Sequence, residues 1–172
     1  THMDTELKQV IDKIQEQGHS EPDNCKATLE TSSVLGGRFR SDVKIRDHAM
    51  TIDEPEAIGG TDRGPNPVEV ILAALGSCQE ITYRAYAAAL DISIDKISVE
   101  LEGDIDFRGF FGVDDSIRPG FEKIRARVKI ESDAPESEIE HLRETVNKHC
   151  PVLDILSNKV PVDLDVVVSV KA

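Results

Sequence analysis

The sequence predicts an α+β fold in which antiparallel sheets pack against helices within one domain. The chain has 172 residues, of which 39% are hydrophobic, and this is enough to bury one core. Segments with the two-residue alternation of strands occur in consecutive runs, separated by only a few helices. Such runs favour an antiparallel sheet over a parallel sheet built from alternating strands and helices.

The N-terminal part of the chain is expected to be a helical extension covering residues 1–23. Apolar residues at helical spacing predict a helix over residues 4–18. Residues 1–3 have the character of an expression-tag remnant and are excluded from the predicted fold. The remaining residues, 24–172, are expected to form the single domain.

A β-meander is expected at the start of this domain. Residues 24–34 are Thr-rich and extended, and Gly36-Gly37 predicts a turn before the alternating apolar residues at 38–46. Residues 50–52 predict a third strand. A loop rich in Gly, Pro and charge follows over residues 53–65.

A long helix from about Pro67 to Leu90 comes next, and its start is well specified. Asn66 can cap the first turn, Pro67 suits the first helical position, and Glu69 at the third position completes a start that resembles a capping box. The segment VILAALGSC within this helix is apolar on nearly every side. A helix of that kind is buried in a core or at a subunit interface.

The rest of the domain predicts a β-hairpin, two helices and a last strand. The expected elements are strands at 97–107 and 121–132 with a connecting loop at 108–120, helices at 137–149 and 151–158, and a strand at 161–170.

The charge of the chain excludes several classes of function. Asp and Glu number 33 against 20 Lys and Arg, so neither nucleic acid nor an anionic membrane is an expected partner. No apolar run is long enough to span a membrane and no secretion signal is evident, so a cytoplasmic protein is expected. No histidine pair, C-x-x-C, P-loop or G-x-G-x-x-G motif indicates a metal or a cofactor.

The three cysteines are the candidates for chemistry, and their odd number and wide spacing favour cytosolic thiols over a disulfide framework. Cys25 is interpreted as a small, half-buried hydrophobic residue that begins a strand near the N-terminus, and Cys78 lies inside the apolar helix. Cys150 directly precedes Pro151, which suits the first position of the next helix, so Cys150 is a candidate N-cap. The positive end of a helix favours a thiolate at that position.

Two cysteine-centred motifs resemble those of a known family. GPNPVEVILAALGSC and HCPVLDIL, with GGRF and a D-E-P-x-x-x-G-G loop upstream, resemble the OsmC/Ohr family of osmotically inducible and organic hydroperoxide resistance proteins. The resemblance extends over about residues 24–170. It implies curved antiparallel sheets around a long central helix, in an intertwined homodimer whose partner subunit buries the apolar helix.

The resemblance also implies a thiol peroxidase. Cys78 would attack an organic hydroperoxide as a thiolate, and Cys150 would resolve the sulfenic acid into a Cys78–Cys150 disulfide. A dithiol reductant, often a lipoyl group in the family, would then reduce that disulfide. In the family an Arg from an early hairpin promotes ionisation of the first cysteine, and a Glu at the start of the central helix holds that Arg.

This chain departs from the family pattern at the Glu. Val68 follows Asn66-Pro67 where the peroxidases have Glu, and Glu69 comes one residue later. At about 100° per residue, Glu69 lies roughly 180° around the helix from Cys78, whereas the peroxidase spacing gives about 80°. Glu69 is therefore interpreted first as a capping residue, and it keeps a place among the candidate catalytic residues.

The sequence leaves undecided both which Arg would activate Cys78 and which activity the protein has. Arg38, directly after Gly36-Gly37, is the best candidate, and Arg40 and Arg63 are alternatives. The displaced Glu keeps two other functions open. One is a redox-sensing or small-molecule-binding OsmC-like dimer without efficient peroxidase activity, and the other is a thiol-dependent activity on a thioester or an electrophile.

Overall fold

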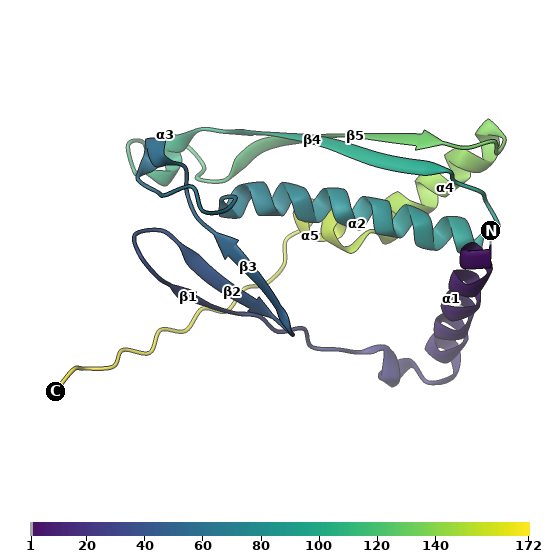
Figure 1. Ribbon diagram of the computed structural model, residues 1–172, viewed down its shortest axis with the longest axis horizontal. Coiled ribbons are helices and arrows are strands. Elements are labelled where there is room, and N and C mark those ends of the chain that lie inside the picture. The colour runs from purple at the N-terminus through teal and green to yellow at the C-terminus, as the bar shows by residue number, and fades with distance from the viewer. Residues whose placement is uncertain (1) are drawn as a thin grey trace.

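The longest helix, α2 (Pro67–Ala89), packs against three other helices and one strand, and it organises the fold (Figure 1). The computed structural model describes residues 2–172. The other helices are α1 (His2–Ser20), α3 (Phe107–Phe110), α4 (Glu136–His149) and α5 (Pro151–Ser157). The strands are β1 (Ser32–Leu35), β2 (Ser41–Ile45), β3 (His48–Ile52), β4 (Lys96–Ile105) and β5 (Phe121–Glu131). These elements confirm the predicted α+β class.

Helix α2 begins where the sequence predicts, and it is buried on one side only. The Asn66 side chain accepts a hydrogen bond from the Glu69 backbone N–H at 2.8 Å, and the Glu69 carboxylate accepts from the Asn66 backbone N–H at 2.9 Å. This reciprocal pair is a capping box. On the side of α2 that faces solvent, the side chain of Ile81 is 69% exposed.

The first sheet is an antiparallel meander in the order β1-β2-β3, as the alternation predicts. Arg38 and Arg46 occupy its two turns and have positive φ angles of 44° and 53°. The sheet is joined to α2 by the loop 53–66 and packs closely against no helix or strand elsewhere in residues 2–172 (Figure 1).

The second sheet is the long hairpin β4–β5, which covers α2 on the side opposite the meander (Figure 1). An irregularity in its register falls between Asp104 and Ile105, directly after Gly103. A Cβ atom on Gly103 would lie 2.5 Å from the ring of Phe121, so this glycine lets the ring lie against the strand backbone.

The core is small and lies between the second half of α2, helix α4 and the hairpin. Its buried members are Tyr83, Ala87, Ile92, Ile94, Leu142 and Val146. Apolar side chains of β4 and β5, among them Ile97 and Val128, pack against this cluster.

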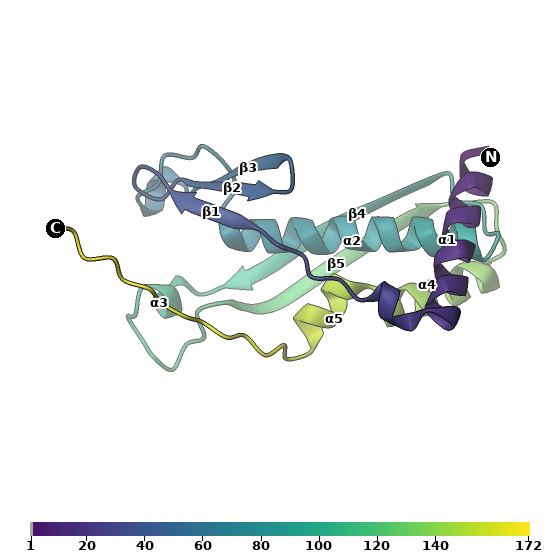
Figure 2. The same ribbon diagram turned by 90° about the horizontal axis from the view of Figure 1, so that it is seen from below.

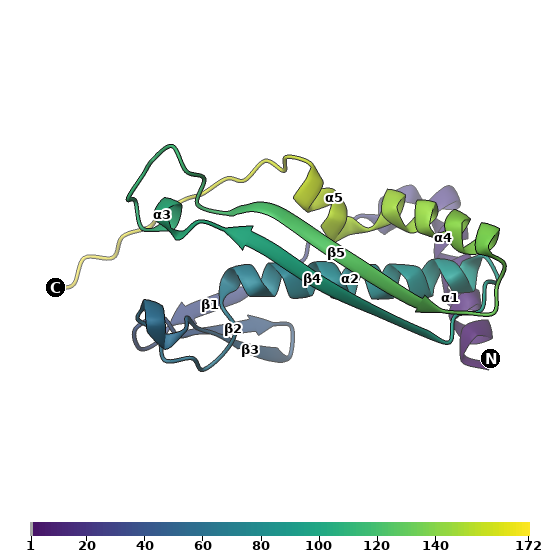
Figure 3. The same ribbon diagram turned by 90° about the horizontal axis from the view of Figure 1, so that it is seen from above.

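The C-terminal segment differs from the prediction. No helix or strand follows Ser157, so the strand expected at 161–170 is absent, and the tail extends away from the rest of the chain (Figures 1–3). A strand needs a neighbouring strand to pair its backbone groups, and no strand within residues 2–172 pairs with the tail. The same requirement explains the short first strand. Of the residues predicted to be extended near 24–34, only those that belong to Ser32–Leu35 form a paired strand.

Two further predictions concern the N-terminal residues. Cys25 ends a short 3-10 helix, Pro22–Cys25, and is exposed, so it is not the strand residue with a packing role that the sequence predicts. The tag-remnant interpretation of residues 1–3 includes Thr1, which lies outside the described residues.

Candidate functional site

The two cysteines of the sequence motifs meet although 72 residues separate them in the chain. Cys78 lies in the middle of α2, and Cys150 lies at the junction where α4 ends and α5 begins with Pro151. The two sulfur atoms are 3.3 Å apart, and both thiols are free. Cys150 is 1% exposed, whereas Cys78 is half-buried and is the more exposed of the two residues.

The surroundings of the two sulfurs differ, and the difference favours charge on Cys150. Burial raises the pKa of the Cys78 thiol, and hydrogen bonds from the Val152 backbone N–H and from Thr82 offset this only in part. Burial also opposes ionisation of Cys150, but the backbone N–H of Leu153, the Cys78 thiol and the side chains of Gln79 and Thr82 together lower its pKa.

Glu69 caps the start of α2, as described above, and its carboxylate is exposed. Val68, which stands at the position of the family's Glu, is half-buried and lines a groove of mixed polarity with Ile71, Leu75 and Leu153. The structure therefore places an apolar side chain, and not a carboxylate, where the peroxidase motif has its Glu.

The three candidate arginines lie at the surface. The Arg38 guanidinium donates to the Gly59 carbonyl oxygen at 3.4 Å, and Arg40 pairs with Asp42 at 3.6 Å. The Arg63 side chain is exposed. No cationic side chain is among the principal influences on Cys78 or Cys150. An activating role for Arg38 therefore remains a prediction.

Asp53 is a structural residue near the site that the sequence does not single out. It is fully buried, and its carboxylate accepts hydrogen bonds from the Thr61 hydroxyl at 2.6 Å and from the backbone N–H groups of Glu54 and Arg63 at 2.8 Å and 3.2 Å. The hydroxyl of Thr61 contributes most to lowering its pKa to about 2. The first letter of the D-E-P motif was the available signal, and its role is to organise the loop that leads into α2.

Glycines allow that loop to fold tightly. A Cβ atom at Gly60 would lie 1.8 Å from the Glu54 carbonyl oxygen, and one at Gly64 would lie 2.1 Å from the Thr51 carbonyl oxygen. No other residue type fits at these two positions without displacing the backbone. The G-G of the upstream motif thus reflects a close approach of two chain segments.

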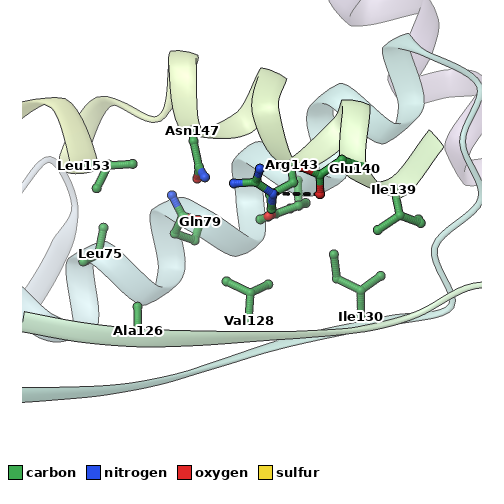
Figure 4. Close-up of a pocket in the computed structure, with 11 residues that line it drawn as sticks. Leu75, Gln79, Ala126, Val128, Ile130, Ile139, Glu140, Arg143, Asn147 and Leu153 are labelled. Carbon is green, nitrogen blue, oxygen red and sulfur yellow. Dashed lines mark hydrogen bonds and ion pairs between the residues drawn. The ribbon is translucent and has the colours of Figure 1, made fainter. Parts of the chain in front are cut away.

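A cavity of about 490 Å³ lies between α2, α4 and β5 (Figure 4). Its floor is apolar and consists of Ala126, Val128 and Ile130 from β5. On the opposite wall the side chains of Gln79, Arg143 and Asn147 gather (Figure 4). Arg143 is ion-paired with Glu140, which lies one helical turn earlier in α4. The cavity thus combines an apolar floor on β5 with several polar side chains from α2 and α4.

Within residues 2–172, no group of three or more His, Cys, Asp or Glu side chains is arranged to hold a metal ion. No helix in this described part of the chain is long and apolar enough to cross a membrane.

Comparison with known protein families decides the relationship. The model of the OsmC family, described as OsmC-like protein, matches residues 60–165, which is more than half of the chain. The chain belongs to the OsmC-like protein family. Cys78, Cys150 and the helix that carries Cys78 fall within the matched residues. No curated protein matches the chain closely enough to count as a relative.

Solved structures show the same OsmC-like fold. An OsmC-like protein from Mycoplasma pneumoniae has a TM-score of 0.66 at 22% identity, covering 78% of this chain and 90% of that one. An organic hydroperoxide resistance protein from Legionella pneumophila has a TM-score of 0.58 at 21% identity, covering 76% and 89%. One from Elizabethkingia anophelis has a TM-score of 0.59 at 19% identity, covering 78% and 91%. At these identities the likeness establishes the fold alone.

Proposed function

We propose that this OsmC-like protein is a thiol peroxidase of organic hydroperoxides, with Cys78 and Cys150 as its redox pair. The observation that carries the proposal is the 3.3 Å separation of the two sulfurs. A disulfide of about 2.05 Å can close from that distance with little movement of α2 or of the α4–α5 junction. Two similar structures are named organic hydroperoxide resistance proteins, and their names support this choice of substrate.

The reaction follows from the accessibility of the two thiols. The half-buried Cys78, as a thiolate, attacks the O–O bond, forms an S–O bond, and expels an alkoxide that takes up a proton. Cys78 is then a sulfenic acid and the hydroperoxide has become an alcohol. The Cys150 thiolate attacks the Cys78 sulfur and expels hydroxide, which leaves as water after protonation. A dithiol such as a lipoyl group reduces the disulfide in two exchange steps and is itself oxidised to a disulfide.

The proposal includes a homodimer. Three surfaces of the described chain support it: the meander β1–β3 without close packing partners, the exposed side of α2 around Ile81, and the unpaired tail, whose Leu164 is 91% exposed. Exposed apolar surfaces of this kind usually mark protein interfaces. The role of Arg38 also depends on a second subunit, because in its own chain its guanidinium contacts the Gly59 carbonyl.

The cytoplasm is the setting that this proposal assumes, since reducing conditions keep both thiols available. No metal or cofactor takes part in the proposed reaction. Glu69 caps α2 and so supports the helix that carries Cys78. Arg38 is the candidate cation that would stabilise the Cys78 thiolate.

Consumption of tert-butyl hydroperoxide by the reduced protein, with dihydrolipoamide as the dithiol, tests the proposal. We expect Cys78→Ser to abolish turnover. Cys150→Ser should consume about one equivalent and stop at a sulfenic acid on Cys78 that dimedone traps. Cys25→Ser is the matched control and should turn over normally, because Cys25 is exposed and outside the pair. Absence of hydroperoxide consumption by the reduced wild-type protein would contradict the proposal.

A second candidate is a redox-sensing dimer that forms the same disulfide without efficient peroxidase turnover. One observation favours it, since burial raises the pKa of Cys78 and no cation counteracts this within the described chain. Rapid oxidation of the pair by hydrogen peroxide or oxidised glutathione, with no preference for alkyl hydroperoxides, would select this candidate.

A further inference from the structure

The cavity of about 490 Å³ between α2, α4 and β5 has the size and the lining of a ligand site (Figure 4). Small-molecule sites commonly measure about 300–1,000 Å³ and combine apolar walls with a few converging polar groups. Within the described chain, neither Cys78 nor Cys150 is among the residues that line this cavity. The cavity is therefore a different place from the pair of sulfurs.

The apolar part of the cavity is elongated. Leu75, Ala126 and Leu153 line both this cavity and the neighbouring groove of about 470 Å³, which extends to Val68. The cavity and the groove therefore adjoin each other along β5. An extended hydrocarbon chain fits such a shape better than a compact ring system does. Its burial there is favourable because apolar surface leaves water.

Arg143 supplies a cation whose hydrogen-bonding capacity is only partly used. Among the residues that line the cavity in the described chain, Arg143 is the one cation and Glu140 the one acid. The Nε and Nη2 atoms of Arg143 donate to the Glu140 carboxylate, and its Nη1 atom makes no hydrogen bond within residues 2–172. A guanidinium is a planar fork with more N–H donors than one carboxylate uses. Its other edge can therefore bind a second carboxylate.

Two amide side chains lie at the same end of the cavity. Asn147 follows Arg143 by one turn of α4, and Gln79 points toward it from α2 (Figure 4). The Gln79 side chain is 5% exposed, and its Nε2 atom has no hydrogen-bond partner. A buried N–H group without an acceptor is costly, so an acceptor that enters the cavity stabilises this arrangement.

We propose that the cavity binds an aliphatic carboxylate, with the carboxylate group at Arg143, Asn147 and Gln79 and the hydrocarbon chain along β5. A carboxylate has two oxygens with about four lone-pair sites, so it can accept from all three side chains. Hydrogen bonds to a charged acceptor are also stronger than those between neutral groups. The inference does not rest on the proposed function, because this ligand carries no peroxide and is not consumed.

The bound carboxylate connects the elements that carry the two cysteines. Gln79 belongs to α2, Arg143 to α4 and Leu153 to α5. A molecule that contacts all three helices in the folded protein stabilises their packing, so its binding should raise the melting temperature. Because no thiol takes part, binding should need neither peroxide nor a reductant.

Octanoate is the probe that tests the inference, added to the full-length protein. Saturable changes in the methyl NMR signals of Val128 and Ile130 measure its binding, because both side chains form the floor of the cavity. We expect a dissociation constant of about 1 mM or lower for a ligand of this size. Octan-1-ol and octylamine have the same chain with a neutral and a cationic head group, and each should bind at least about tenfold more weakly.

Three substitutions examine the two parts of the cavity. Arg143→Leu should weaken octanoate binding by about tenfold or more, and Gln79→Leu should weaken it by about threefold or more. Ala126→Phe places a ring over the floor and should prevent binding. Arg125→Leu is the matched control, because it removes the same charge from the other face of β5, where Arg125 pairs with Asp104. It should bind octanoate as the wild type does.

Several results would overturn the inference. One is the absence of saturable binding by the folded wild type up to about 10 mM octanoate. Another is equal binding by an Arg143→Leu protein that is folded by circular dichroism, or equal affinity for octan-1-ol and octanoate. Saturable shifts at Cys78 without shifts at Val128 and Ile130 would place octanoate at the sulfurs instead.

The tail of the chain is the competing occupant of the cavity. If octanoate binds only to the protein with Leu164→Asp and Val166→Asp, the tail fills the cavity in the wild type and the inference is wrong. The result is also separate from the peroxidase proposal. Failure to consume hydroperoxide would leave octanoate binding intact, and failure to bind octanoate would leave the reaction of the two thiols intact.

Discussion

At the scale of single residues, Asp53 illustrates how one carboxylate can organise a long loop. Its oxygens collect a hydroxyl and backbone N–H groups from both ends of residues 53–63. The donors hold the carboxylate in its charged form, which outweighs the effect of burial. Because this loop leads directly into the capped start of α2, Asp53 also fixes the position of the helix that carries Cys78.

Asp53→Asn should lower the melting temperature at pH 7 by roughly 5 °C or more, because an amide NH2 group replaces one acceptor where donors point. The pKa of Asp53 is lowered from 3.8 to about 2. Its stabilisation is therefore present above pH 3.8 and is lost as the pH falls towards 2. Thermal unfolding at several pH values should show the two proteins converging over that range. Asp62→Asn, exposed in the same loop at φ 53°, should change little.

At the scale of elements, local interactions determine where α2 begins, and tertiary contacts determine which elements it packs against. The capping box and Pro67 determine where the helix begins, and the small cluster around Tyr83 determines which side is buried. Cys78 lies at the border between the buried and the exposed side, which explains why it is half-buried beside a fully buried Cys150.

Asn66→Ala should lower the free energy of unfolding by about 1 kcal/mol, because the Glu69 backbone N–H loses its side-chain acceptor. Glu69→Gln should be close to neutral, since Gln also completes a capping box. Urea unfolding measures both. If Glu69 were instead the holder of an activating Arg, Glu69→Gln would lose peroxidase activity at unchanged stability, and our assignment of Glu69 as a cap would be wrong.

At the scale of the whole molecule, one chain leaves much apolar surface uncovered. The tail alternates apolar and polar residues, with Val162, Leu164 and Val166 all strongly exposed. This is the pattern of a half-buried strand that has no neighbour in its own chain. A second copy is the partner that the proposed dimer supplies.

The double substitution Leu164→Asp and Val166→Asp should convert the dimer to a monomer, or make it at least tenfold weaker, because it places two charges on the apolar face of the tail. Light scattering coupled to size-exclusion chromatography measures the mass. Ser169→Asp adds a charge to the opposite face and should leave the dimer intact. A wild-type protein that is monomeric at micromolar concentration would contradict the proposed assembly.

Local patterns account for much of the fold. The start of α2, the meander, the β4–β5 hairpin, and the helix that begins at Pro151 all depend on interactions between residues that are near in sequence. Capping, turn residues and hydrophobic period act over a few residues and can be read without the fold. The predicted strand at 161–170 failed because a strand depends on a distant neighbour as well as on its own pattern.

The sequence by itself determined the order of the elements, the elements to which Cys78 and Cys150 belong, and the role of Glu69 in capping α2. The tertiary structure alone decided that Asp53 is buried and that the two sulfurs lie 3.3 Å apart. The physical reason is the distance along the sequence between the residues that interact. Burial and the sharing of a proton between sulfurs arise only when segments 72 residues apart are packed together.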